Sequence, residues 1–296
     1  NRMIFVYDER KSFPLFPRGY RRTGSGREKN ETKRCREKGE KGAKIMDISL
    51  QLYSVREMTR LNFELTLKDV GAMGYDGVEF AGFEGLDAHT LRARLDEVGL
   101  VCLGSHTGID LLRSDLEGQI AYHKILGARY INCPGARPEK LDGTVQEQID
   151  AWKALAAEFN EIGRRIAEAG MVFCYHNHSF EFEPVGDTCP EEIIFDNTDP
   201  AYVKVELDPC WIENTGRRSV DFMDEYADAM ELLHIKELTS VGDPTAKVIG
   251  QGCIDFPAVI EKGWQVGVKA LIVEHEGLEG DIMGDVKAGL DYLRSI

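Results

Sequence analysis

The histidines and carboxylates of this chain recur at one kind of position. Five of the seven histidines, and several acidic residues, stand at the end of a short apolar, β-branched run just before a turn or helix. These residues are His106, His176, His178, Asp208, His234, Glu274, His275 and Glu276. Imidazoles and carboxylates bind divalent metal ions and transfer protons. Gathered at the carboxyl ends of successive strands, they predict a metal or acid–base site at one end of an α/β barrel.

The order of the segments predicts the scaffold that positions these side chains. From Lys44 onward the chain repeats a unit of a short apolar strand followed by a helical pattern. We expect strands at residues 46–53, 75–80, 100–106, 129–133, 171–177, 202–208, 231–237 and 270–276. We expect helices near residues 60–73, 88–98, 114–127, 145–169, 190–197, 219–229, 255–265 and 282–294. Gly71, Gly99 and Gly127 stand where helices should end, and Asp255 should begin the seventh helix.

Eight strand–helix units predict a single α/β domain, a closed (β/α)8 or TIM barrel of residues 46–296. The alternative is an open doubly wound sheet, which needs fewer units and usually has a glycine-rich turn after its first strand. No GxGxxG motif follows the first expected strand. We therefore favour the barrel.

Side-chain alternation in the sixth expected strand shows which residues point into the barrel. Lys204, Glu206 and Asp208 share one face, because strand side chains alternate with a period of two. The apolar face of this strand must pack on helices, so the charged face points inward. Buried charges need partners or a shared cation. We expect Lys204 and Glu206, lower in the strand, to pair with each other, and we expect Asp208 to bind a metal together with His234 and Glu274.

The composition limits the partners of the protein. The net charge is −15, divided into +8 for residues 1–45 and −23 for the remainder. A body this acidic repels phosphates, so we expect neither DNA nor RNA as a partner. No apolar run approaches the roughly 18 residues of a membrane span. The seven cysteines form no CxxC pair, which is typical of reduced cysteines in a cytoplasmic protein.

Residues 1–45 differ from the rest of the chain. Residues 21–44 have almost no apolar side chains and no periodicity. Such a segment cannot bury enough apolar surface to fold, so we predict a basic extension that is disordered or poorly packed. A basic arm for an anionic partner is the alternative. The segment before Met46 also fits a translated leader, with Met46 as the true start.

Six segments resemble the xylose isomerase-like barrel superfamily, and within it the sugar phosphate isomerases/epimerases. They are LQLYSVRE (50–57), GYDGVEF (74–80), YHNHSFEF (175–182), ELDPCW (206–211), HIKE (234–237) and IVEHE (272–276). The resemblance covers about residues 46–296. It implies a (β/α)8 enzyme with one divalent metal ion. The sequence has no nucleotide-binding loop or flavin-type fingerprint, so we expect no organic cofactor.

The resemblance also implies the metal ligands. Carried over by motif, they are Asp208, His234 and Glu274, together with a ligand from the fifth strand. Sugar epimerases of this superfamily usually have a glutamate there, where this chain has His176, with Glu181 five residues on. Nitrogen and oxygen donors together suit Mn²⁺, our first expectation, or Zn²⁺ and Fe²⁺ better than Ca²⁺. Mg²⁺ and Co²⁺ are further alternatives.

The histidine in the fifth strand bears on the chemistry. Epimerisation beside a carbonyl commonly uses two carboxylates, one on each face of an enediolate. If His176 replaces one of them, the sequence favours reactions that need a single base, namely aldose–ketose isomerisation or β-elimination. Candidate catalytic residues are His178 and Glu276 as bases, Lys236 as a cation for an oxyanion, and Glu274 through the metal. Candidate substrate-binding residues are Glu79, His106, Glu181 and Trp211.

We therefore expect a metal-dependent isomerase or epimerase that abstracts a proton next to a metal-bound carbonyl of a small, unphosphorylated sugar. The alternative is a lyase or dehydratase that performs β-elimination on a keto-sugar or keto-cyclitol. An abasic-site endonuclease and a non-catalytic partner subunit are less favoured, because the body is acidic and the ligand set is intact. Both homo-oligomers and hetero-oligomers are compatible with the sequence.

Overall fold

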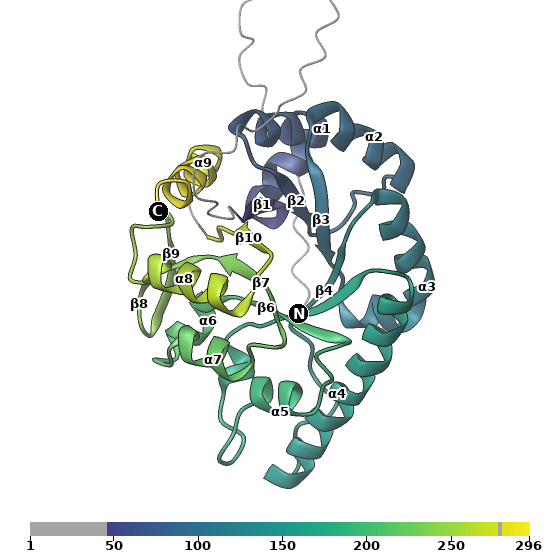
Figure 1. The fold of residues 1–296 in the computed structure, drawn as a ribbon, viewed down its shortest axis with the longest axis vertical. Coiled ribbons are helices and arrows are strands. Elements are labelled where there is room, and N and C mark those ends of the chain that lie inside the picture. The colour runs from purple at the N-terminus through teal and green to yellow at the C-terminus, as the bar shows by residue number, and fades with distance from the viewer. Residues whose placement is uncertain (1–45, 278–279) are drawn as a thin grey trace, which may run out of the picture. The chain divides into compact units, whose positions relative to one another are not determined.

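Eight parallel strands close into a barrel, with helices around the outside (Figure 1). The computed structural model describes residues 46–277 and 280–296. Around the barrel the strand order is β1, β10, β7, β6, β5, β4, β3, β2, so each strand lies beside its neighbours in sequence and the last pairs with the first. The predicted TIM barrel is confirmed. The predicted extension of residues 1–45 lies outside the described residues.

The barrel strands overlap all eight predicted strands. They are β1 (Asp47–Gln51), β2 (Gly77–Phe80), β3 (Val101–His106), β4 (Tyr130–Pro134), β5 (Val172–His176), β6 (Val203–Leu207), β7 (Met230–Ile235) and β10 (Ala270–Val273). Several strands end before the predicted residue, because the apolar pattern continues past the last paired residue into the loops. Those loops carry part of the polar side chains discussed below.

The helices of the described chain lie between the strands. They are α1 (Arg56–Met73), α2 (Ala88–Val98), α3 (Ile109–Leu126), α4 (Val145–Glu168), α5 (Pro190–Asp196), α6 (Pro209–Asn214), α7 (Ser219–Glu225), α8 (Phe256–Val266) and α9 (Ile282–Leu293). Two 3-10 turns, η1 (Leu52–Val55) and η2 (Phe180–Phe182), follow β1 and β5. The sequence patterns missed α6 and the antiparallel pair β8 (Glu237–Ser240) and β9 (Asp243–Lys247). None of these helices is both long and apolar enough to cross a membrane.

Local sequence accounts for several helix ends. Asp255 begins α8 as its N-cap and accepts a hydrogen bond from a backbone N–H in the first turn. Gly99 and Gly127 end α2 and α3 with φ of 75° and 78°, which glycine adopts without strain. Gly71 does not end a helix as predicted but lies inside α1. A Cβ atom there would stand 2.9 Å from the Val98 carbonyl oxygen, so close packing explains this glycine.

Apolar side chains form two separate clusters. The larger lies between strands and helices and includes Phe80, Phe159 and Phe173. The smaller lies inside the barrel and contains Tyr130, Cys174, Leu232, Ala270 and Ile272. Two positions after four of these residues, on the same face of each strand, stand Asn132, His176, His234 and Glu274. The barrel interior is thus apolar in its lower part and polar toward the carboxyl ends of its strands.

Candidate metal centre

Two overlapping groups of ligand-type side chains lie at the carboxyl ends of the strands. The first contains His176, Asp208, His234 and Glu274, which are the four residues expected to hold the metal. In each group the ligand atoms all lie within 4.8 Å of one another. His176 ends β5 and His234 belongs to β7, whereas Asp208 and Glu274 directly follow β6 and β10. The fold therefore brings together residues separated by up to about a hundred positions.

The first group has buried polar atoms that lack a hydrogen-bond partner in the described part of the chain. Asp208 caps α6 with Oδ1, which accepts a hydrogen bond from the Cys210 N–H at 2.9 Å. Its Oδ2 is buried and has no hydrogen-bond partner among the described residues, and the same holds for Nδ1 of His176. Unsatisfied buried polar atoms are costly. The two imidazoles and two carboxylates, with these two atoms unpaired, fit a divalent transition-metal ion such as Mn²⁺, Zn²⁺, Fe²⁺ or Co²⁺.

The electrostatics of this group are strongly divided. Burial raises the pKa of Asp208 to about 7, although Lys236 and His234 oppose the shift. Burial acts the same way on Glu274, but there Lys236 and His234 prevail and hold its pKa far below the usual range. His234 donates from Nδ1 to Glu274 Oε2 at 2.8 Å. On balance, the surroundings therefore disfavour the charge of Asp208 more than the charge of Glu274, and a bound cation would stabilise both carboxylates.

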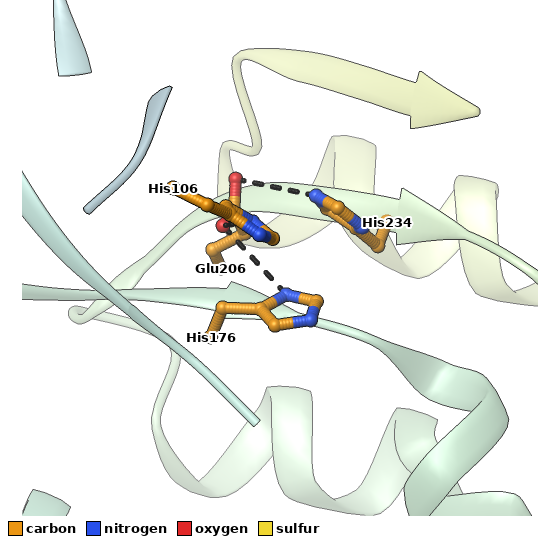
Figure 2. Close-up of side chains that lie close together, drawn as sticks. All are labelled: His106, His176, Glu206 and His234. Carbon is orange, nitrogen blue, oxygen red and sulfur yellow. Dashed lines mark hydrogen bonds and ion pairs between the residues drawn. The ribbon is translucent and has the colours of Figure 1, made fainter. Parts of the chain in front are cut away.

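The second group lies beneath the first and contains His106, His176, Glu206 and His234. Figure 2 shows the three imidazoles gathered round the Glu206 carboxylate. His106 donates from Nε2 to Glu206 Oε2 at 3.1 Å. His176 Nδ1 lies 3.6 Å from the same oxygen. The predicted pair of Glu206 with Lys204 is wrong, because Lys204 donates instead to the backbone carbonyl of Asp228.

Glu79 joins Glu206 in this layer, and we call these two residues the carboxylate floor. Both side chains are 0% exposed. Asn132 bridges them, donating from Nδ2 to Glu79 Oε1 and to Glu206 Oε1. Gln51 donates to Glu79 Oε2 at 2.7 Å. Glu79 was expected to contact substrate, but burial and hydrogen bonds to both oxygens place it under the site instead.

The two floor carboxyls differ in charge. Burial disfavours ionisation of Glu206, but the adjacent His234 and His106 overcome it and lower its pKa to about 2. Burial, and then the charge of Glu206, raise the pKa of Glu79. Two carboxylates so close cannot both ionise freely. Glu206 is therefore the more firmly charged member of the floor.

A cation and an aromatic ring stand beside the first group. Lys236 lies with Nζ 4.3 Å from the centre of the Trp211 ring. Its Nζ also pairs with Glu276 and lies 3.9 Å from Glu274 Oε1. Burial opposes its charge, but Glu274 and Asp208 raise the pKa of Lys236 above its usual value. This places a permanent cation near the predicted ligands, as the sequence suggested.

His178 lies in the loop after β5, next to the ligand group. Its ring centre is 5.0 Å from that of His176 and 6.0 Å from that of Trp211. Burial, reinforced by Lys236, lowers the pKa of His178 to about 4. Nδ1 of His178 and Nε1 of Trp211 are buried without a hydrogen-bond partner in the part of the chain that the structure describes. A neutral imidazole with a free nitrogen can accept a proton.

Glu181 does not join either ligand group. It is fully buried and accepts hydrogen bonds from the Tyr175 hydroxyl at 2.7 Å and from the His178 N–H at 2.8 Å. Burial raises its pKa to about 7. Glu181 thus holds the backbone of His178 in place, and the fifth-strand member of the ligand group is His176. Glu181 was expected to bind substrate or metal, and its hydrogen bonds speak against both roles.

Sequence reasoning missed three polar residues of the site. Gln51 ends β1 and Asn132 lies within β4, and both hydrogen-bond to the carboxylate floor. Asn177 joins the ends of β5 and β6 by two hydrogen bonds to the backbone of Asp208, at 2.9 and 3.1 Å. All three are neutral amides. Such side chains are neither strong metal ligands nor bases, and the signal that could have found them is an inward-facing amide near a strand end.

Comparison with known proteins agrees with this architecture. The family model described as xylose isomerase-like TIM barrel matches residues 67–296. The inosose dehydratase of Geobacillus kaustophilus is 25% identical over 232 residues, covering 66% of this chain and 74% of that protein. A sugar phosphate isomerase/epimerase from Parabacteroides distasonis has a solved structure with a TM-score of 0.73 and 24% identity, covering 85% of this chain and 99% of that one. The probable 3-DHS dehydratase AsbF from Bacillus anthracis gives a TM-score of 0.65 at 16% identity, covering 84% and 99%. This chain therefore belongs to the xylose isomerase-like TIM barrel family.

Proposed function

We propose that this protein is a divalent-metal-dependent enzyme that removes a proton from the carbon beside the carbonyl of a small keto-sugar or keto-cyclitol. Loss of water from the next carbon is the favoured outcome, which makes it a dehydratase. One observation carries the proposal, namely the group of His176, Asp208, His234 and Glu274 with Lys236 near it.

The ligand group supports a role for a metal. Its donors are two imidazoles and two carboxylates, and Asp208 Oδ2 has no hydrogen-bond partner within residues 46–277 and 280–296. When bound, a divalent ion supplies Lewis acidity toward the substrate carbonyl and stabilises the negative charge that develops there. Lys236, beside the group, adds a fixed positive charge to the same region.

His178 supplies the base in this proposal. Its ring is neutral at physiological pH, because its pKa lies near 4, and its Nδ1 is free of hydrogen bonds from the described residues. It takes the proton from the carbon beside the carbonyl as the electron pair moves toward the carbonyl oxygen. That electron pair then forms a double bond between the α- and β-carbons, and the bond between the β-carbon and its hydroxyl oxygen breaks. The departing hydroxide takes up the proton that His178 holds. Atoms and charge balance as one molecule of water.

Trp211 and Glu276 complete this side of the site. Trp211 offers an aromatic face against which a sugar or cyclitol ring can stack. Glu276 pairs with Lys236 and is 35% exposed, so it orients the ammonium group while remaining within reach of a substrate hydroxyl. Of the two residues predicted as bases, we assign the base to His178 and give Glu276 the role of a contact for substrate.

Dehydration is favoured because the site has one evident base. Two-base epimerisation would use a carboxylate on each face of the intermediate, and His176 stands where one of them is usual. A single imidazole can both remove the proton and return it to the leaving hydroxyl. The relatedness to inosose dehydratase, at 25% identity, supports the same choice and suggests a keto-cyclitol.

Isomerisation is the second candidate, and the same observation supports it. A single base that returns its proton to the neighbouring carbon, rather than to a hydroxyl, interconverts an aldose and a ketose. Both reactions share the first proton transfer and the same residues. They differ only in whether the substrate has a hydroxyl on the β-carbon placed to leave.

The experiment follows substrate and solvent hydrogen together. Protein freed of metal with a chelator is reloaded with Mn²⁺, Co²⁺, Zn²⁺ or Mg²⁺ and incubated in D₂O with inososes and open-chain keto-sugars. We expect metal-dependent loss of water from at least one inosose, seen by NMR and by an ultraviolet enone band. Deuterium beside the carbonyl without loss of water would select isomerisation. Turnover that is equal with and without metal would overturn the proposal.

A further inference from the structure

We propose that the carboxylate floor, Glu79 and Glu206, positions His234 so that its Nδ1 points to the bound ion. This inference rests on the proposed function, because it concerns how the site holds its metal. Neither carboxylate belongs to the ligand group of His176, Asp208, His234 and Glu274. They act through His234, as positioning residues.

The two ring nitrogens of His234 face in different directions. Nδ1 lies 2.8 Å from Glu274 Oε2, on the side of the predicted ligands. Nε2 lies 2.9 Å from Glu79 Oε2 and 3.6 Å from Glu206 Oε1. Both ring nitrogens face carboxylate oxygens, which accept, so both carry hydrogen in the metal-free protein. Glu274, the partner of Nδ1, belongs to the ligand group and the floor does not, so an ion would displace the hydrogen on Nδ1 and leave the one on Nε2. A neutral imidazole protonated at Nε2 has its lone pair on Nδ1, where a metal would bind.

The floor is itself held rigidly from several strands. Gln51 on β1 and Asn132 on β4 each donate to Glu79, and Asn132 also donates to Glu206. His106 on β3 donates to Glu206 and lies 3.3 Å from Glu79 Oε2. The accepting oxygens therefore cannot rotate away without breaking hydrogen bonds to three other strands. This fixes the plane of the His234 ring as well as its tautomer.

Burial separates the floor from the substrate side. Glu79, Glu206 and His234 are each 0% exposed, and the polar layer that they form rests on the apolar cluster inside the barrel. A carboxylate that accepts from a ligating imidazole also makes the imidazole a stronger donor to the metal. The floor beneath His234, charged mainly at Glu206, thus adds negative charge to the metal site without occupying a coordination position.

A second reading of the same residues is a second ion. His106, His176, Glu206 and His234 also lie close enough to share one. The hydrogen bonds argue against it, because Nε2 of His106 and Nε2 of His234 already donate to the floor. An ion there would require both nitrogens to give up these protons, whereas an ion in the first group displaces only the Nδ1 hydrogen of His234. We therefore expect one ion per chain, bound on the Nδ1 side of His234.

The test measures metal binding directly. Mn²⁺ is titrated into chelator-treated protein by calorimetry, for wild type, Glu79→Gln, Glu206→Gln and a control, Glu231→Gln. Glu231 is a buried glutamate on the same strand as His234, accepts a hydrogen bond from the Tyr130 hydroxyl at 2.8 Å, and is in neither ligand group. We expect one ion per wild-type chain and an affinity about 10- to 100-fold weaker in each floor variant. The control should bind as wild type does.

A spectroscopic measurement distinguishes a change in the positioning of His234 from a general loss of structural stability. In Zn²⁺-loaded protein labelled with ¹⁵N-histidine, His234 should show hydrogen on Nε2 and none on Nδ1. In Glu79→Gln the Nε2–H signal should shift upfield and exchange faster with water, at an unchanged melting temperature.

The outcomes are distinguishable from a failure of the proposed function. Wild type that binds no divalent ion would overturn both the proposed function and this inference. Wild type that binds one ion, with floor variants within twofold of it, would overturn this inference alone. Two ions per chain would overturn it in favour of the second ion site, and an Nδ1–H tautomer in loaded wild type would contradict it as well.

Discussion

Two buried histidines of this protein lie in opposite electrostatic environments. His123 in α3 is 0% exposed, and its Nδ1 donates to the Gln119 carbonyl at 2.7 Å. Nε2 therefore accepts, from the Ser105 hydroxyl at 2.6 Å. His234 is equally buried, but both of its nitrogens face carboxylates. One histidine has neutral partners on both sides, and the other has acidic partners on both sides.

The pKa values follow these partners. Burial lowers the pKa of His123 to about 4, since its neutral neighbours offer nothing to compensate a charge. Burial opposes the charge of His234 in the same way, but Glu206, Glu274 and Glu79 outweigh it and raise its pKa well above the usual value. Burial alone therefore makes a histidine neutral. The site is built to keep a positive charge, which a proton supplies in the apoprotein and a metal ion can replace.

The largest effect should come from removing a carboxylate of the ligand group. In Asp208→Ala, the loss of one of about four ligands should abolish bound metal and reduce turnover to background. Metal content by elemental analysis and turnover of the identified substrate check this.

Asp208 also caps α6, so Asp255→Ala, which removes the cap of α8, is the matched control. Each lost cap costs about 1 kcal/mol, and only the first variant should lose metal. Full metal occupancy in Asp208→Ala would show that the acidic surroundings do not serve an ion.

A smaller effect is expected at a third kind of histidine. His178 is neutral, as His123 is, but it borders the ligand group and has a free Nδ1 among the described residues. His178→Gln should slow turnover by about 10²- to 10⁴-fold, because it removes the base. Metal affinity should stay at the wild-type value. His89→Gln, on the exposed face of α2, is the control. Unchanged turnover in His178→Gln would move the base to another residue, with Glu276 the next candidate.

Sequence patterns located the strand ends and three members of the first ligand group, Asp208, His234 and Glu274. The fifth-strand member came from the family resemblance, which left His176 and Glu181 as alternatives. The sequence patterns also predicted a helix at residues 114–127, which contains His123, and the structure has this residue in α3. They failed for Glu206, which has the same parity as Asp208 but stands one layer lower. The lower position of Glu206 was predicted, but its histidine partners come from other strands, and a single sequence does not contain the stagger between strands that brings them together. Asn132 was missed for a related reason, since an amide carries no charge to mark it as part of a site.

The smallest effect is a difference in stability with pH, and it isolates His123. Its folded pKa of about 4 lies below the value of about 6.5 for an exposed histidine. As pH falls through 6.5, the unfolded chain binds a proton that the folded chain does not, so stability present above pH 6.5 is lost toward pH 4. At pH 5 the loss from this residue is about 2 kcal/mol.

Other buried groups add a pH dependence of their own, which a comparison of wild type with a His123 variant removes. The free energy of unfolding in urea is measured at pH 7.5 and pH 5 for wild type and His123→Gln. The fall in stability should be about 2 kcal/mol smaller in the variant, whatever the substitution costs at neutral pH. Equal falls would mean that His123 keeps its proton when folded, and neutral partners would then no longer explain the contrast with His234.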